Sequence, residues 1–208
     1  IHNIEVDKVI VAIGITGNID NLGLEEIDIK TDKGHIVTDE WSKTNIKNIY
    51  AIGDVAGAPW LAHKASHEAV ICVENIAGLP NLHPLNKNNI PGCVYSSPQI
   101  ASVGLSEKVA LEKYKIKVGK FPLMANGKAQ AIGSTSGFIK VIYEENTGEL
   151  LGAHMIGDGV TELIHGYTIA KNMEGTEEDI KTTVFPHPTL SESLHEAVLN
   201  AYGISIHF

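Results

Sequence analysis

The sequence has little of what a metal site, a disulfide-rich fold or a nucleic-acid-binding surface requires. Cys72 and Cys93 are its only cysteines, too few and too far apart for a zinc knuckle or a redox Cys-x-x-Cys motif. Lysine and arginine form no cluster, and 16 basic against 25 acidic residues leave a net charge of −9. Nucleic acid and anionic membrane surfaces are therefore not expected as partners. So few cysteines are typical of a reducing compartment.

Several longer sequence signals are also missing. No apolar run reaches the roughly 18 residues that a membrane span needs, so no membrane association is expected. Neither a Gly-x-Gly-x-x-Gly dinucleotide fingerprint nor a Gly-x-x-x-x-Gly-Lys-Ser/Thr phosphate loop occurs. His154 and His165 lack a spacing such as His-Glu-x-x-His, and we expect no metal site.

The residues that are present favour well-packed cores. Apolar residues make up 43% of the 208 positions, which suits one large domain or two small ones. Residues 9–14 form an apolar run ending in glycine, and residues 49–53 form a second. Both are typical of strands covered on two faces in an α/β layer. The chain opens at Ile1 and runs directly into strand-like residues 4–13, so we expect a piece of a longer protein.

A stretch rich in proline and asparagine, residues 81–91, is the expected boundary between two domains. Before it, apolar steps of three and four residues predict a helix over 61–77, with Cys72 as a buried, inert thiol. After it, the pattern predicts an α+β domain, an antiparallel sheet with helices packed to one side. We expect strands near 99–103, 117–121, 138–143 and 149–156 and helices at 106–114, 160–173 and 190–202.

Residues 187–192, His-Pro-Thr-Leu-Ser-Glu, are the strongest candidate for chemistry. They place His187 in a proline-stiffened loop and Glu192 on the first turn of the following helix. A carboxylate orients a histidine ring and favours its charged form, which suits proton transfer near neutral pH. Alternatively, Thr189 and Glu192 fit a capping box, which would satisfy backbone donors without any chemistry.

Asp54 follows the second apolar run and precedes a predicted helix, the arrangement that places ligands at strand ends. Its carboxylate could accept hydrogen bonds from the hydroxyls of a sugar or polyol. The helix start near Ala62 and His63 offers unpaired N–H groups to an anionic ligand atom. An equally open interpretation is that Asp54 caps a turn and the helix start faces water.

The segments AIGD (51–54), LAHKA (61–65), YSSPQIASVGLSE (95–107), NGKA (126–129) and HPTLSE (187–192) occur in this order. Together they resemble the C-terminal half of a flavin-dependent disulfide reductase, most closely the dihydrolipoamide dehydrogenases. The resemblance covers essentially the whole chain. It implies that residues 1–13 end an NAD-binding domain, 14–82 form the C-terminal segment of an FAD-binding domain and 83–208 form a dimerisation domain.

The resemblance also implies roles for single residues. Gly14 would lie close to the nicotinamide cofactor and Asp54 would hold the ribityl chain of FAD. His187 would be the acid–base, reaching the active site of the partner subunit of a homodimer, with Glu192 orienting it. The isoalloxazine would meet Trp60, Leu61, Ala62 and His63.

The family implies an enzyme that oxidises protein-bound dihydrolipoamide with NAD⁺ through a redox disulfide and FAD. Its partners would be the lipoyl domains of 2-oxo acid dehydrogenase complexes, such as the pyruvate dehydrogenase complex. It would work in the cytoplasm, or in the mitochondrial matrix of a eukaryote.

The chain departs from the family pattern where chemistry is concerned. The paired redox cysteines and both N-terminal fingerprints are absent, and Ile15 stands where the family has arginine. The chain by itself is therefore expected to be inactive. Two alternatives stay open: another disulfide reductase of the group, acting on glutathione or a similar thiol, or a dimerisation module without redox activity.

Overall fold

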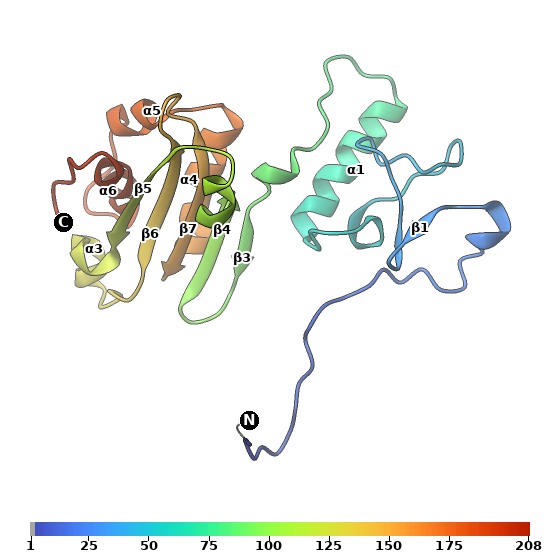
Figure 1. The fold of residues 1–208 in the computed structure, drawn as a ribbon, viewed down its shortest axis with the longest axis horizontal. Helices are drawn as coiled ribbons and strands as arrows, with labels where there is room; N and C mark the ends of the chain where they lie inside the picture. The colour runs from blue at the N-terminus through green and yellow to red at the C-terminus, as the bar shows by residue number, and fades with distance from the viewer. Residues whose placement is uncertain (1–2) are drawn as a thin grey trace. The chain divides into compact units, whose positions relative to one another are not determined.

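A computed structural model describes residues 3–208, so that Ile1 and His2, the start of the predicted NAD-domain tail, lie outside the described residues. The chain forms two compact units, one up to Leu85 and one from Asn86 onward (Figure 1). The division falls inside the stretch 81–91, where the sequence predicts a boundary.

The second unit is built on a five-stranded antiparallel sheet. Along each strand the side chains alternate between two faces, as the period of a pleated strand requires. Ile139, Val141 and Tyr143 contribute to the main core, whereas Ile142 contributes to a smaller cluster. The order across the sheet is β3 (Gly92–Val94), β4 (Gln99–Gly104), β7 (Leu150–Gly157), β6 (Phe138–Glu144) and β5 (Ile116–Pro122).

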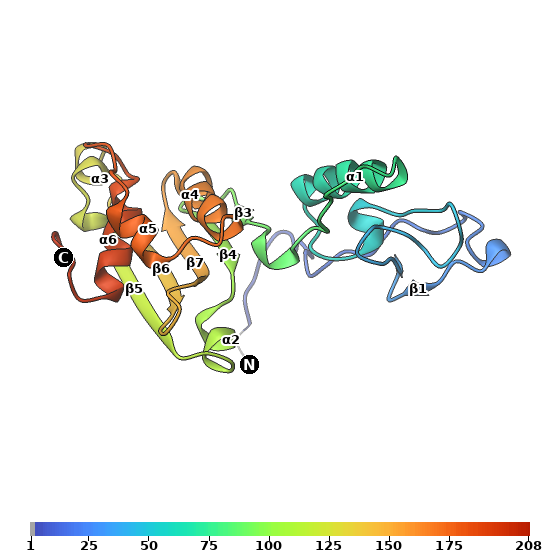
Figure 2. The same ribbon diagram turned by 90° about the horizontal axis from the view of Figure 1, so that it is seen from above.

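Helices cover both faces of this sheet unequally. The main core lies under α4 (Val160–Asn172), α5 (Glu177–Thr182) and α6 (Glu192–Ala201). The short α2 (Glu107–Leu111) lies on the opposite side, where Ala110 packs with Ile142 and Leu151 (Figure 2). The prediction that helices pack to one side therefore holds for the main core but is wrong for α2, because the apolar side chains of the second face also need cover.

Helix α6 approaches strand β5 very closely. A Cβ atom added at Gly119 would lie 1.9 Å from the carbonyl oxygen of Ala197 and 2.7 Å from the nitrogen of Ala201. Only glycine allows this contact between backbones. The first turn of α6, which carries Glu192, is thereby held on a helix that is fixed to the sheet.

The first unit has a smaller core. Its long helix is α1 (Ala62–Ile76), and a two-residue hairpin pairs β1 (Thr31–Asp32) with β2 (His35–Ile36). Short 3₁₀ turns occur at η1 (Glu25–Ile27) and η2 (Gly53–Ala56). The buried apolar residues of its main cluster are Leu24, Ile29, Ile36 and Ala51.

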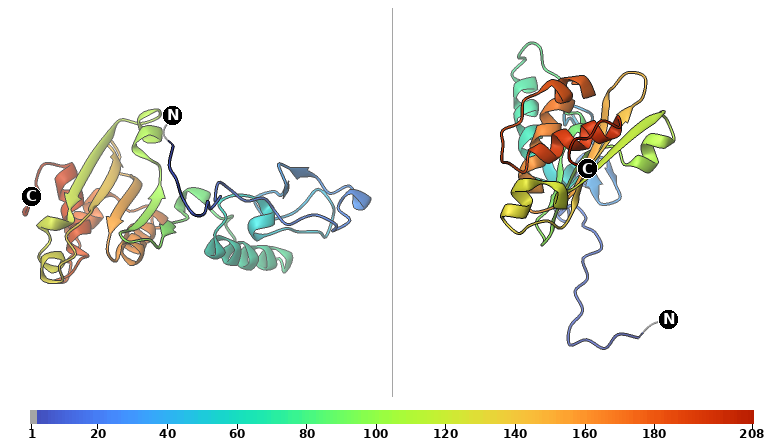
Figure 3. Two further views of the ribbon diagram at one scale, coloured as in Figure 1. Left: turned by 90° about the horizontal axis from the view of Figure 1, so that it is seen from below. Right: turned by 90° about the vertical axis from the view of Figure 1, so that its left-hand side faces the viewer.

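The two buried strands predicted for this unit do not form. Residues 4–13 run as an extended segment, and Ile10 and Ile13 are 90% and 94% exposed (Figure 3). Residues 49–53 make only one isolated bridge, between Tyr50 and Lys43. A strand needs a neighbouring strand for its backbone groups, and no stretch of residues 3–208 pairs with residues 4–13.

Most of the other predicted elements are confirmed with small shifts at their ends. The predicted helix at 106–114 is shorter, Glu107–Leu111, and the last helix begins at Glu192 instead of Leu190. The short strand β3, the helix α3 (Gly127–Ala131), the 3₁₀ turns η3 (Lys87–Asn89) and η4 (Leu123–Ala125), and α5 were not predicted. Within residues 3–208 no helix combines the length and the apolar character that crossing a membrane demands.

Candidate functional site

In the second unit, His187 and Glu192 form a hydrogen-bonded pair. His187 Nδ1 lies 2.9 Å from Glu192 Oε1, and the histidine side chain is 77% exposed. An ionised carboxylate only accepts hydrogen bonds, so Nδ1 carries the proton. Nε2 makes no hydrogen bond to any of residues 3–208. The pair thus presents a free imidazole nitrogen to solvent, with its tautomer set by the carboxylate.

The second oxygen of Glu192 binds the backbone. Oε2 accepts the N–H of Thr189 at 2.9 Å, while the Thr189 hydroxyl donates to the carbonyl of Pro186. Half of the predicted capping box therefore exists, and it coexists with the contact to His187. The carboxylate of Glu192 therefore makes both predicted contacts, the one that orients His187 and the one that binds the backbone before the helix.

The Glu192 carboxyl is held in its ionised form. Partial burial raises its pKa, but the hydrogen bonds from Thr189 and His187 and the nearby imidazole charges lower the pKa more, and the net shift is downward. An anionic carboxylate beside Nδ1 stabilises the imidazolium that forms when Nε2 takes up a proton.

Asn126 supports the loop that carries His187, and sequence reasoning assigned it no role. This buried side chain accepts the N–H of Ala129 through Oδ1 and donates to the carbonyl of Thr189 through Nδ2 at 3.0 Å. The signal was its position before α3, where asparagine is a preferred N-cap. That signal says nothing about its second partner, 63 residues away along the chain.

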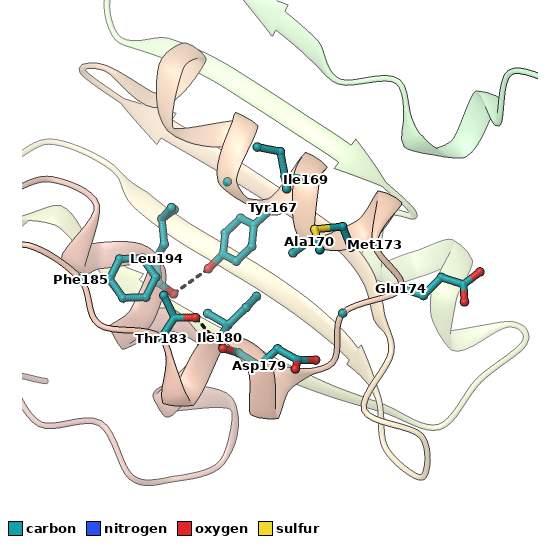
Figure 4. Close-up of a pocket in the computed structure, with 12 residues that line it drawn as sticks. Tyr167, Ile169, Ala170, Met173, Glu174, Asp179, Ile180, Thr183, Phe185 and Leu194 are labelled. Carbon is teal, nitrogen blue, oxygen red and sulfur yellow. Dashed lines mark hydrogen bonds between the residues drawn. The ribbon is translucent and has the colours of Figure 1, made fainter.

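An apolar pocket of about 470 Å³ lies between α4, α5 and the segment that leads to His187 (Figure 4). Thr183 and Phe185 contribute to its wall, and the hydroxyl of Tyr167 donates to the carbonyl of Leu194 at 2.7 Å. The predicted site residues do not line it. The lining is mostly apolar and also includes the polar residues Glu174, Asp179 and Thr183.

In the first unit, Asp54 lies on the η2 turn and is exposed. Its carboxylate makes no hydrogen bond within the described part of the chain. The start of α1 has no side-chain cap, because its N-cap residue is Leu61. The N–H groups of the first turn, which include that of Ala62, therefore offer donors and a partial positive charge to an acceptor. These groups fit a ligand with hydroxyls and an electron-rich acceptor, as FAD has.

Trp60 is positioned by a residue that the sequence did not single out. Its indole N–H donates to His35 Nε2 at 3.1 Å, and the two rings stack with centroids 5.7 Å apart. Nδ1 of the His35 ring contacts the carbonyl of Lys33, which fixes the neutral tautomer.

Gly14 is exposed, and a Cβ atom there would meet nothing within 4 Å. Its φ of +147° favours glycine, but residues 3–208 give it no neighbour that would form a cofactor site. A role for Gly14 near nicotinamide stays a prediction.

No disulfide is formed, since both cysteines are free. Cys72 is buried in α1 as predicted, and burial raises the pKa of its thiol. Among residues 3–208 no group of three or more histidine, cysteine, aspartate or glutamate side chains could hold a metal ion.

Comparison with known families agrees with both halves of this description. Residues 90–198 match the dimerisation domain of the pyridine nucleotide-disulphide oxidoreductases, and residues 2–69 match the model named for that family itself. The chain belongs to the pyridine nucleotide-disulphide oxidoreductases.

Among curated relatives of this chain, the dihydrolipoyl dehydrogenase of Rhizobium etli is 58% identical over 98% of this chain and 42% of the relative. That of Bacillus subtilis is 48% identical over 97% of this chain and 43% of the relative. The chain thus spans less than half the length of these relatives. Among solved structures, the HOCl-induced flavoprotein disulfide reductase RclA of Escherichia coli has a TM-score of 0.83 at 25% identity, covering 90% of this chain and 43% of that one. The resemblance to dihydrolipoamide dehydrogenases is confirmed.

Proposed function

We propose that this chain is the C-terminal part of a dihydrolipoyl dehydrogenase that works as a homodimer with FAD and NAD⁺. The His187–Glu192 pair is the observation that carries the proposal, because an exposed imidazole with a fixed tautomer has the geometry that a general base needs. The names of the relatives favour dihydrolipoamide over glutathione as the thiol substrate.

In the proposed reaction, Nε2 of His187 takes the proton of one thiol of dihydrolipoamide. The resulting thiolate attacks one sulfur of the redox disulfide, the disulfide bond breaks, and the other sulfur leaves as a thiolate. The second substrate thiol then gives its proton to the released enzyme thiolate and attacks the substrate sulfur of the mixed disulfide, which displaces the remaining enzyme sulfur as a thiolate. That thiolate takes the proton held on His187, so that dihydrolipoamide is oxidised to lipoamide and the enzyme disulfide is reduced to a dithiol. Cys72 and Cys93 are free, and the proposal assigns the disulfide to residues outside this chain.

The first unit would hold part of the FAD. Asp54 would accept hydrogen bonds from ribityl hydroxyls, while Trp60, Leu61, Ala62 and His63 would lie against the isoalloxazine. The uncapped start of α1 would stabilise negative charge there. When bound, FAD would carry electrons from the enzyme dithiol to NAD⁺, whose nicotinamide would lie near Gly14.

The match to a dimerisation domain supports a second copy of the protein as partner. His187 would then serve the disulfide of the partner subunit. Lipoyl domains of a 2-oxo acid dehydrogenase complex, such as the pyruvate dehydrogenase complex, would deliver the substrate. The free cysteines agree with the cytoplasm, or with the mitochondrial matrix in a eukaryote.

The test is His187→Gln in the full-length protein. We expect reduction of the enzyme by dihydrolipoamide to slow by about 10²–10⁴-fold, the usual contribution of a general base, with FAD content unchanged. Stopped-flow absorbance of the flavin follows this half-reaction, and His83→Gln, at another exposed histidine, is the control. A parallel loss of FAD would show that His187 is structural. Faster turnover of the unmodified protein with glutathione than with dihydrolipoamide would assign it to the glutathione-type enzymes.

A further inference from the structure

Helix α1 buries a lysine–glutamate ion pair beneath the turn that carries Asp54. Lys64 Nζ lies 3.1 Å from Glu68 Oε1, and the side chains are 0% and 12% exposed. The same Nζ donates to the carbonyls of Gly53 at 3.1 Å and Gly57 at 2.8 Å. Glu68 Oε2 accepts the N–H of Gly53 at 2.8 Å. The pair thus binds both ends of the η2 turn.

These contacts leave the backbone around Asp54 little freedom. Both polar backbone groups of Gly53 are bound to α1, and Gly57 donates its N–H to the carbonyl of Asp54. Gly53 has a φ of +74°, and a Cβ atom there would lie 3.3 Å from the Cβ of Ala65. Asp54 therefore stands between two glycines that are tied to the same lysine.

Stability alone does not account for a buried ion pair. Desolvation of two charges offsets most of their attraction, and apolar residues of similar volume are often as stabilising. Helix α1 also carries apolar residues, but they do not take the buried position. Val73 and Ile76 are 64% and 56% exposed, whereas Lys64 is 1% exposed. The charged pair, and not the apolar stripe, faces the turn. The pair supplies directed hydrogen bonds, and these fix the geometry of the η2 turn.

We propose that Lys64 and Glu68 are positioning residues that hold Asp54 and the first turn of α1 as one preorganised FAD-binding unit. The inference rests on the proposed function, in which Asp54 and residues 60–63 contact different parts of one FAD molecule. Two separate contacts on one ligand add their full strength only if their spacing is already set before binding. In this proposal Lys64 and Glu68 act through the backbone of the η2 turn and make no contact with the cofactor themselves.

The experiment replaces the pair with apolar residues of similar size, Lys64→Met with Glu68→Leu, in the full-length protein. The FAD dissociation constant of the apoprotein is expected to rise about tenfold, as for the loss of one charge-assisted hydrogen bond. The absorption spectrum of the bound flavin is expected to shift, and the apoprotein melting temperature to stay close to that of the unmodified protein. The matched control is Lys140→Met with Glu107→Leu, at an ion pair of 3.0 Å in the second unit.

An unchanged FAD dissociation constant and flavin spectrum in the double variant would overturn the inference. An equal loss of FAD affinity in the Lys64/Glu68 double variant and in the Lys140/Glu107 control variant would also overturn the inference. If the double variant does not fold, the same criteria apply to Glu68→Gln, which keeps an oxygen for the Gly53 N–H and removes the charge. Failure of the unmodified protein to bind FAD would instead contradict the proposed function.

Discussion

Each oxygen of the Glu192 carboxylate has its own partner, one in the imidazole of His187 and one in the backbone of Thr189. Glu192 thereby binds the backbone just before α6 and also orients the imidazole of His187, the candidate base. The downward shift of the Glu192 pKa means that this arrangement is kept across the neutral range.

Replacing Glu192 separates these two roles. In Glu192→Ala, the imidazole of His187 loses the carboxylate that orients it, so we expect dihydrolipoamide oxidation by the full-length protein to slow. We also expect a stability loss of roughly 1 kcal/mol from the lost backbone contact at the helix start. Turnover and urea unfolding measure the two effects. Glu192→Gln, which can still accept the Thr189 N–H, is the control for the second effect. Unchanged turnover in the alanine variant would leave capping as the sole role.

Single residues were predictable where their partners are close in the sequence. His187 and Glu192 are five residues apart, and their contact follows from a loop leading into a helix. The contact between Trp60 and His35 spans 25 residues and that between Asn126 and Thr189 spans 63. Such pairs depend on which elements the fold brings together, which no local pattern contains.

At the scale of elements, α6 anchors the C-terminal segment as well as the candidate base. The buried carboxylate of Glu196 accepts hydrogen bonds from the Ser205 hydroxyl, from the N–H groups of Ile206 and His207, and from His207 Nδ1 at 2.7 Å. Burial raises the pKa of Glu196, but these hydrogen bonds lower it more, and the net shift is downward.

We expect Glu196→Ala to destabilise the second unit by roughly 2 kcal/mol at neutral pH, since several hydrogen bonds to a charged group are lost. The folded pKa lies below the ordinary value of 4.5, so this stabilisation is complete above that value and is lost as the pH falls through the folded pKa. The difference between variant and unmodified protein should therefore shrink in acid. Urea unfolding against pH and amide exchange of residues 205–207 measure it. Glu112→Ala, at an exposed site, is the control; a difference independent of pH would contradict the assignment.

Whole elements were predicted well where the pattern is long and its partners lie within the chain. Strands β4 to β7 and helices α1 and α4 lie where periodicity placed them. Residues 4–13 carry as strong a strand pattern as β6, yet they form no strand because residues 3–208 supply no neighbour for them. Short elements such as β3, with three residues, and α5, with six, were missed because so short a pattern resembles a loop.

At the scale of the whole molecule, the two units differ in how much core they have. The second unit buries large side chains completely, among them Phe121, Ile139, Tyr143 and Tyr167. The main cluster of the first unit consists of four residues that each keep some exposure, between 7% and 9%. Since apolar burial is the main stabilising contribution, the units should differ in stability.

We expect heating of the isolated chain to unfold the first unit before the second. The exposed stretch 81–91 between the cores should then be the first place that a protease cuts. Limited proteolysis with mass spectrometry is expected to leave a resistant product that begins inside this stretch and extends to the C-terminal segment. Calorimetry should show two transitions. A resistant product that keeps residues 15–76 while residues 92–200 are digested would contradict the prediction.

The order of the motifs, the periodicity of the longer elements and the local His187–Glu192 pair were all determined by the sequence, because each depends on residues a few positions apart or on their succession. The tertiary structure alone decided that Lys64 and Glu68 lie under the Asp54 turn, that His35 meets Trp60 and that α2 takes the second face of the sheet. Those outcomes depend on close packing between segments distant in the chain, where the available space and the unpaired polar groups select the partner.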